Sequence, residues 1–419
     1  MRDGGYASQK LLRIWWLKPD RLVFAFILPL LWVFFLLSGH LLAERNVADF
    51  FTFGACIALS ALLVAYAIGA FFSYKLRVPA IAVRSISERW FHFFFILTFA
   101  AYIIWFIPIF RNFGVVLAIA AGTPDSVYLA RNMLATMPGI TTFTQADIAF
   151  VCLLSMRMID GFSIPKIIKR EAILIFLLAA FRTLVMSERL ALIEVAVPMI
   201  PAVLVHMRGK LIRYFKVLNL APFLGIFMLI VFFGVTEYFR SWVNFYSMRD
   251  TSFTDFIINR IATYYIYAIN TGLGAVDRFY SHYNFPCYSF YWLLRMPVVG
   301  ESIDKFFHVY NPTKQVLSAY ADPQFNNVSG LVALVWDFGW VGSLFVCSIS
   351  GIVTGLAWKS LACGRGALRY FYPILYVGLL DLLREPYLGQ GRSFVPIVLL
   401  LIMVLVNSKT RDMHLAPIT

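Results

Sequence analysis

Charged residues are scarce in this sequence, at 14% of 419 positions. A soluble globular domain carries about 25%, so the composition excludes an ordinary soluble protein. Apolar residues take their place, at 61% of the chain and a mean hydropathy of +0.77. The composition therefore predicts an integral membrane protein.

The motifs of several common chemistries are also missing. The chain has five cysteines, no two of them at metal-ligand spacing. It contains no phosphate-binding P-loop, no HExxH and no CxxC. We therefore expect no disulfide framework, no metal site and no cofactor.

Apolar segments of about 20 residues, long enough to cross a bilayer, recur along the whole chain. They predict an all-α membrane protein with about ten transmembrane helices. The basic stretch before the first segment is typical of a retained signal anchor. The predicted spans are 22–43, 50–73, 92–112, 142–160, 171–187, 190–206, 219–238, 330–357, 370–384 and 393–408.

The basic residues predict the orientation of these spans. If the amino terminus is cytoplasmic, the inner segments hold 21 of the 36 Lys and Arg residues. This bias follows the positive-inside rule and predicts that both termini are cytoplasmic. The net charge of +14 then reflects topology and contact with anionic lipids, so we expect no nucleic-acid partner.

The spans divide the chain into three parts. Residues 1–238 hold seven transmembrane helices, 239–329 form a large outer loop, and 330–419 hold three more helices and a cytoplasmic tail. In the loop, segment 253–279 has polar residues at helical spacing, which predicts an interfacial helix lying in the membrane surface. The prolines that follow predict short helices.

Several charged residues interrupt the apolar spans near the outer side. In the stretch FRTLVMSERLALIE (181–194), Glu188 and Arg189 fall at the tip of a predicted hairpin, with Arg182 and Glu194 below the surface. Charges at that depth are unfavourable and usually mark functional sites; the alternative is ion pairs that join two helices. Similar positions are Glu237, Arg240, Asp337, Asp381, Arg384, Glu385 and Arg392. Together they predict a polar cavity open to the outer side.

The outer segments hold twelve Arg but only two Lys. Arg binds phosphates and carboxylates through a planar fork of donors, so these residues favour an anionic ligand. A sugar linked to a lipid diphosphate would need cations for the departing diphosphate and a base for the attacking hydroxyl. The candidate bases are Glu188, Glu194, Glu237, His282 and His308.

The segment NNVSGLVALVWDFGWVGSLFVCSISGIVTG (326–355) resembles the signature stretch of the oligosaccharide repeat-unit polymerases, the Wzy-type O-antigen and exopolysaccharide polymerases. An Asn-containing loop end leads into a span with D-x-G-x-x-G, here Asp337, Gly339 and Gly342. The number of spans, the late large loop and the SERLALIE hairpin are similar too.

This resemblance implies a glycosyltransferase-C-like fold and a reaction on the outer face of the bacterial inner membrane. The growing glycan would pass from undecaprenyl diphosphate to the non-reducing end of a new lipid-linked repeat unit. Because Arg can stabilise the departing diphosphate by itself, we expect the reaction to need no metal. The implied partners are undecaprenyl-diphosphate-linked oligosaccharides, membrane lipids, a chain-length regulator and a flippase.

The polymerase hypothesis assigns roles to individual residues. The catalytic candidates are Glu188, Glu194 and His282; the diphosphate-binding candidates are Arg182, Arg189, Arg240, Arg249, Arg384 and Arg392; the sugar-binding candidates are Trp242, Tyr264, Tyr265 and Asp337.

Two alternatives remain open. An O-antigen ligase, or another transferase that uses lipid-diphosphate sugars, would share the Arg-lined cavity but have a different acceptor. A polysaccharide flippase or transporter would instead show inverted repeats and broken midplane helices, and the sequence has no internal repeat.

Overall fold

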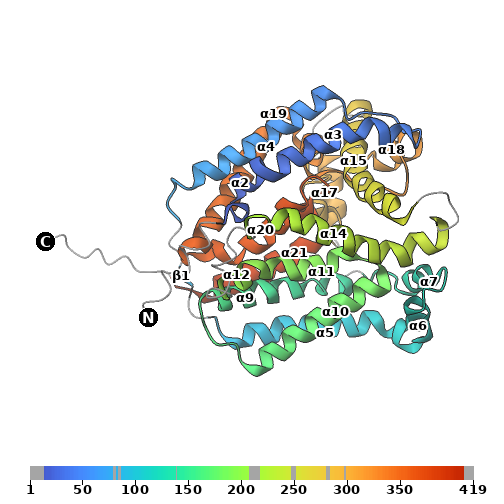
Figure 1. The fold of residues 1–419 in the computed structure, drawn as a ribbon. Coiled ribbons are helices and arrows are strands. Elements are labelled where there is room, and N and C mark those ends of the chain that lie inside the picture. The colour runs from blue at the N-terminus through green and yellow to red at the C-terminus, as the bar shows by residue number, and fades with distance from the viewer. Residues whose placement is uncertain are drawn as a thin grey trace.

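The computed structural model describes residues 14–78, 82–83, 86–137, 139–206, 218–246, 252–279, 284–296 and 299–409. These residues fold almost entirely into helices, most of which run side by side (Figure 1). Those of the first half are η1 (Trp15–Leu17), α2 (Pro19–Leu22), η2 (Val23–Ile27), α3 (Leu28–Ala43), α4 (Phe53–Ser73), α5 (Glu88–Arg111), α6 (Gly114–Ala120), α7 (Ser126–Met133), α8 (Ile140–Phe143), α9 (Ala146–Ile159), α10 (Lys166–Met186), α11 (Arg189–Ala196), η3 (Val197–Met199) and α12 (Ile200–His206).

The second half of the chain continues the bundle. Among the described residues, the strands are β1 (Ala82–Val83) from the first half and β2 (Ser408–Lys409) from the second, which form a short antiparallel pair. Its helices are α14 (Ala221–Glu237), η5 (Tyr238–Tyr246), α15 (Phe253–Phe279), α16 (Tyr291–Leu294), α17 (Val299–Phe307), α18 (Thr313–Tyr320), α19 (Gly330–Cys363), η6 (Ala367–Tyr370), α20 (Tyr372–Leu380), η7 (Tyr387–Gly389) and α21 (Gly391–Asn407).

The long helices are those of an α-helical membrane protein. Among the described residues, five helical segments are long and apolar enough to cross a bilayer: Pro19–Ala43, α4, α5, Ile140–Ile159 and α19. The other predicted spans are helical as well, but they are shorter, carry more charge or, as at Pro198 in η3, are interrupted. Helix α14 and helix α21 have only 17 residues each.

The loops gather at two opposite ends of the bundle (Figure 1). At one end, Lys359 Nζ donates to the carbonyls of Tyr74 and Leu76 at 2.7 and 2.8 Å, and Arg369 pairs with Asp160 at 2.7 Å. Lys359, Arg369, Tyr74 and Leu76 come from loops predicted to be cytoplasmic, and Asp160 ends the span that leads into another such loop. At the other end lie α6, α7 and α18, which come from the segments predicted to be outside (Figure 1).

Helix α4 and helix α19 touch through their backbones. A Cβ built on Gly69 would lie 2.1 Å from the Ser348 carbonyl oxygen, and one on Gly351 would lie 2.0 Å from that of Tyr66. Only glycine permits so close an approach, as at other membrane helix contacts. The two helices therefore form a rigid pair along one side of the bundle.

Helix α15 corrects one prediction. It has the predicted extent, but it is packed into protein instead of lying on the membrane surface. One of its buried polar residues is satisfied by another part of the protein: the Asn270 side chain donates to the Ala48 carbonyl at 2.8 Å and accepts from the backbone amides of Phe50 and Phe51. Polar residues at helical spacing mark one face of a helix, and here Asn270 on that face binds backbone groups of the first outer loop.

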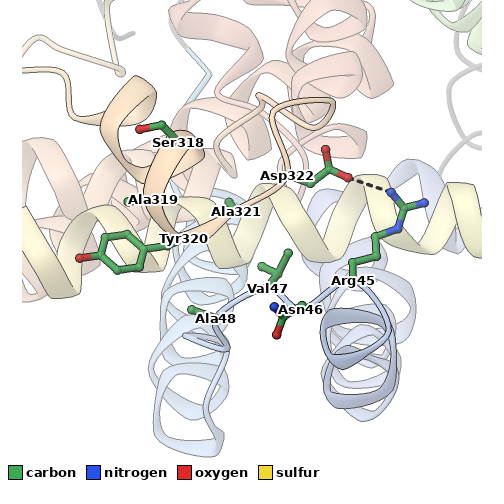
Figure 2. Close-up of a pocket in the computed structure, with 9 residues that line it drawn as sticks. All are labelled: Arg45, Asn46, Val47, Ala48, Ser318, Ala319, Tyr320, Ala321 and Asp322. Carbon is green, nitrogen blue, oxygen red and sulfur yellow. Dashed lines mark hydrogen bonds and ion pairs between the residues drawn. The ribbon is translucent and has the colours of Figure 1, made fainter.

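The first outer loop also contacts the segment before α19 (Figure 2). Arg45 pairs with Asp322 at 2.8 Å, and the Ala48 amide donates to the Tyr320 carbonyl at 3.2 Å. A shallow pocket of about 520 Å³ lies between these two segments. Segments some 270 residues apart are thus joined at this end of the molecule.

Candidate functional site

A cavity of about 1880 Å³ runs through the bundle from the outer end. The hairpin between α10 and α11, the start of α21 and helix α15 surround its mouth, and α14 forms one long wall. Six Arg and three carboxylates are among its lining residues, so the lining has an excess of three positive charges. The charged residues are Arg131, Arg182, Glu188, Arg189, Arg295, Asp381, Arg384, Glu385 and Arg392.

The hairpin turns within two residues. Helix α10 ends at Met186, Ser187 adopts a left-handed conformation with φ +49°, and α11 starts at Arg189. The turn brings Glu188 back over the last turn of α10, where it accepts from Arg182 Nε at 2.7 Å. Arg182 also donates to Thr144 Oγ1 at 3.1 Å, so its guanidinium is held from two sides.

Arg392 joins this hairpin to α21. Its guanidinium contacts the second oxygen of Glu188 and lies 3.3 Å from Glu194 Oε2. The four residues Arg182, Glu188, Arg392 and Glu194 therefore form one chain of alternating charge across three helices. Arg182 and Glu194 were predicted to lie at a similar depth below the outer surface, which would suggest that they pair. In the structure Arg182 pairs with Glu188 instead.

A second group of charges surrounds Glu237 at the end of α14. This carboxylate has no exposed surface; Arg189 Nη2 lies 3.0 Å from Oε1, and Arg260 Nε lies 3.6 Å from Oε2. The Arg189 guanidinium is also stacked 3.6 Å from the centre of the Phe233 ring, a favourable arrangement for a desolvated cation. Arg189 is thus held at the cavity wall by one acid and one ring.

The last hairpin supplies a third group. Arg384 binds Asp381 with two hydrogen bonds of 2.7 and 2.6 Å and Glu385 with one of 2.7 Å. Burial raises the pKa of Glu385 to about 7, against the lowering effect of Arg384. This carboxyl therefore changes its charge near neutral pH.

Two predicted aromatic residues line the mouth. Tyr264 accepts a hydrogen bond of 3.4 Å from Arg189 Nη2, and Tyr265 is stacked on Phe34 at 4.9 Å between ring centres. Trp292, which was not among the predicted site residues, also lines the cavity and is stacked on Phe394 at 4.1 Å.

Other predicted residues lie elsewhere. Asp337 has no exposed surface and accepts from the amides of Tyr288 at 3.1 Å and Ser289 at 2.6 Å. It holds the large loop against α19 just before Gly339, whose φ of +69° and ψ of 173° kink the helix. Asp337 is therefore a structural anchor outside the cavity lining, and its oxygens are occupied by backbone donors.

Trp242 packs against Phe253 and Phe256 and does not line the cavity. Glu194 is buried behind the wall and contacts Arg392 instead of the cavity. Arg240 belongs to η5, directly after the helix that ends in Glu237. Arg249 and His282 lie outside the described residues.

The sequence analysis missed Arg260 as a site residue. It lies in the first third of α15, is only 5% exposed and contacts Glu237 and Gln324. The available signal was a cation in the mostly apolar stretch FIINRIATYYIY (256–267). In the described part of the chain, no group of three His, Cys, Asp or Glu side chains is arranged to hold a metal ion.

No protein-family model, curated protein or solved structure matches this chain. The function of the cavity is therefore argued from its own chemistry.

Proposed function

We propose that this protein polymerises lipid-linked oligosaccharide repeat units at the outer face of the bacterial inner membrane, with its termini in the cytoplasm and a glycosyltransferase-C-like arrangement of about ten spans. The growing glycan would pass from undecaprenyl diphosphate to a new lipid-linked repeat unit. The observation that carries this proposal is a single cavity with a cationic mouth and an apolar interior.

The interior of the cavity suits a lipid chain. Residues of α14 from Pro222 to Phe233 line it, which at 1.5 Å per residue is a length of about 17 Å. Its volume of about 1880 Å³ exceeds the roughly 1,000 Å³ of a large pocket for a small molecule. An amphiphile with a long apolar chain and an anionic head would match both parts.

The mouth suits a diphosphate. The guanidinium groups of Arg182, Arg189 and Arg392 are held in place by carboxylates before any ligand arrives. Cations oriented in advance stabilise the charge that develops on a leaving diphosphate without a reorganisation penalty. Arg182 and Arg392 are both among the residues that line the cavity, and both contact the same Glu188 carboxylate, so two cations converge on one part of the mouth.

These contacts reduce the number of residues that could act as the general base. Glu188 lines the cavity, but both of its carboxylate oxygens are already bound to guanidinium groups, those of Arg182 and Arg392. Glu194 does not reach the cavity and is a positioning residue for Arg392. Glu385 lines the mouth and titrates near neutral pH, as an efficient base should. We therefore place Glu385 beside Glu188 and His282 as a candidate base.

The test is a gel of surface polysaccharide from cells that lack this gene. A polymerase defect leaves a lipid that bears one repeat unit, and the ladder returns when the gene is restored. If polymer persists on undecaprenyl diphosphate without reaching its final acceptor, the protein is a ligase. If lipid-linked units stay on the cytoplasmic side, it is a flippase.

A further inference from the structure

Three uncharged amide side chains form one edge of the cavity mouth. Gln324, Asn326 and Asn327 all line the cavity and precede α19; we call them the carboxamide rim. Within the described part of the chain, the side chains of Asn326 and Asn327 have no hydrogen-bond partner. Each therefore presents one acceptor and two donors to whatever occupies the mouth.

The rim is held rigidly although it is part of a loop. Phe325 is 2% exposed and packs 5.1 Å from Tyr264 and 5.0 Å from Tyr267 between ring centres. The Asp322 side chain is bound to Arg45 (Figure 2), and it also accepts a hydrogen bond of 2.9 Å from the backbone amide of Gln324.

Two further bonds fasten the rim to α15. Arg260 Nη1 donates to Gln324 Oε1 at 3.1 Å, and the Ser329 amide donates to the Ala268 carbonyl at 2.9 Å. A loop fastened at both of its ends presents its side chains in one arrangement, as a binding site requires.

The rim lies next to the cationic part of the mouth. Tyr264 connects the two, because its hydroxyl accepts from Arg189 and its ring packs against Phe325. The Arg189 guanidinium lies 5.3 Å from the centre of the Tyr264 ring, and that centre lies 5.1 Å from the centre of the Phe325 ring. One ring therefore separates the rim from the proposed diphosphate site.

We propose that the carboxamide rim binds the sugar that is attached directly to the lipid diphosphate, and that this sugar is neutral. The inference rests on the proposed function. In a lipid-linked glycan the first sugar is bonded to the diphosphate, so a diphosphate at Arg189 places that sugar beside Tyr264 and the rim.

The chemistry of the rim selects against an acidic sugar. Amide groups donate to and accept from hydroxyl and acetamido groups equally well, but they cannot neutralise a carboxylate. The cation that contacts the rim, Arg260, is already bound to Glu237 and Gln324. A neutral hexose or N-acetylhexosamine therefore fits this edge better than a uronic acid.

The experiment compares lipids with and without a sugar. The full-length protein in detergent is titrated with undecaprenyl diphosphate and with undecaprenyl diphosphate that carries one N-acetylglucosamine or one galactose. For the double variant Asn326→Ala, Asn327→Ala we expect about tenfold weaker binding of the sugar-bearing lipids, the effect of losing two hydrogen bonds. Binding of undecaprenyl diphosphate itself should not change.

A matched control is Asn112→Ala, which removes an exposed amide that lies outside the cavity lining; it should bind all three lipids like the wild type. An equal loss of affinity for all three lipids in the rim variant, or no loss for either sugar-bearing lipid, overturns the inference while the proposed function stands. Failure of the wild-type protein to bind any of the lipids overturns the proposed function and this inference with it.

Discussion

At the scale of single residues, Glu237 is a carboxylate that is completely buried next to charged side chains. It has no exposed surface and faces two guanidinium groups, those of Arg189 and Arg260. Removing one partner of a buried ion pair leaves a charge without full compensation, whereas removing both partners is much less damaging. The same residue thus affects the stability of the fold and the position of a proposed ligand-binding group.

We expect Arg189→Ala to have two separable effects. The rate of polymerisation should fall about a hundredfold through loss of a cation in the mouth, and the free energy of unfolding should fall by about 2–3 kcal/mol because the buried Glu237 carboxylate loses a cationic partner. The double variant Arg189→Ala, Glu237→Gln should recover most of the stability but not the rate. Thermal melting in detergent and polymer length in cells measure the two effects. A double variant that regains polymer would remove Arg189 from the mechanism.

Glu385 determines the expected pH dependence. Burial raises the pKa of its carboxyl to about 7, so it is protonated below that pH and charged above it. As a base it acts only when charged, and we expect the rate at limiting substrate to rise as the pH increases through about 7. A diphosphate that is esterified at both ends does not titrate in this range, so the substrate itself does not contribute to the change of the rate with pH.

The variant Glu385→Gln checks this assignment. It should lower the rate by a factor of about 10²–10⁴ and remove the rise with pH, while the affinity for the lipid stays within a factor of a few. A variant that keeps both the rate and the pH profile would return the role of base to Glu188 or His282.

At the scale of elements, α14 is held mainly at its outer end. Its only buried residues are Phe233, Gly234 and Glu237, all in the last turns, while residues 221–232 are half-buried or exposed. Near its start, Phe223 makes an edge contact with Phe26 at 6.0 Å between ring centres. This wall of the apolar part of the cavity is therefore packed against the rest of the bundle mainly near its outer end.

Two neighbouring positions on α14 test whether the cavity holds a lipid chain. Ile226 lines the cavity and is half-buried, whereas Phe227 is 63% exposed and lies outside the lining. We expect Ile226→Trp to fill part of the cavity and to weaken lipid binding on the order of tenfold. Phe227→Trp should bind like the wild type. Equal behaviour of both variants would mean that the lipid chain lies elsewhere.

At the scale of the whole molecule, the loops predicted to be inside and outside lie at opposite ends (Figure 1). Cysteines provide a test of the orientation. Cys363 is exposed at the end of α19, whereas Cys56, Cys152, Cys287 and Cys347 are buried; burial also raises the pKa of the Cys287 thiol, which lowers its reactivity.

We expect a membrane-impermeant maleimide to leave Cys363 unmodified in intact spheroplasts and to modify it after permeabilisation. A matched control is Ser318→Cys on α18, an exposed position at the other end (Figure 2), which should react in intact spheroplasts. Reaction of Cys363 in intact spheroplasts together with protection of position 318 would invert the orientation.

Much of the fold follows from sequence patterns because the long apolar segments could only be helices in a membrane. The tight turn at Ser187 and the extent of α15 were also predictable, since both depend on local periodicity. The placement of α15 was not: an apolar helix with a polar stripe looks the same on a membrane surface and against the polar backbone of a distant loop. Only the contact of Asn270 with residues 48–51 distinguishes the two.

The sequence indicated which charged residues belong to the site, but not which of them form ion pairs with one another. Charges near the outer ends of spans indicated Arg182, Arg189, Arg392 and Glu188, and these residues do line one cavity. That Arg392 would reach the hairpin of α10 and α11 depends on how helices far apart in the chain pack together. Asp337 shows the reverse case: a buried carboxylate suggested ligand binding, but its partners are two backbone amides.

The carboxylate of Glu188 has a consequence for how this protein can change over evolution. It is shared by Arg182 from α10 and Arg392 from α21, so none of the three residues contributes independently to stability. Coupled positions of this kind deviate from additivity when they are altered singly. We therefore expect homologues to change positions 182, 188 and 392 together. In an alignment of homologues these three positions should covary, even though 204 residues separate the last two.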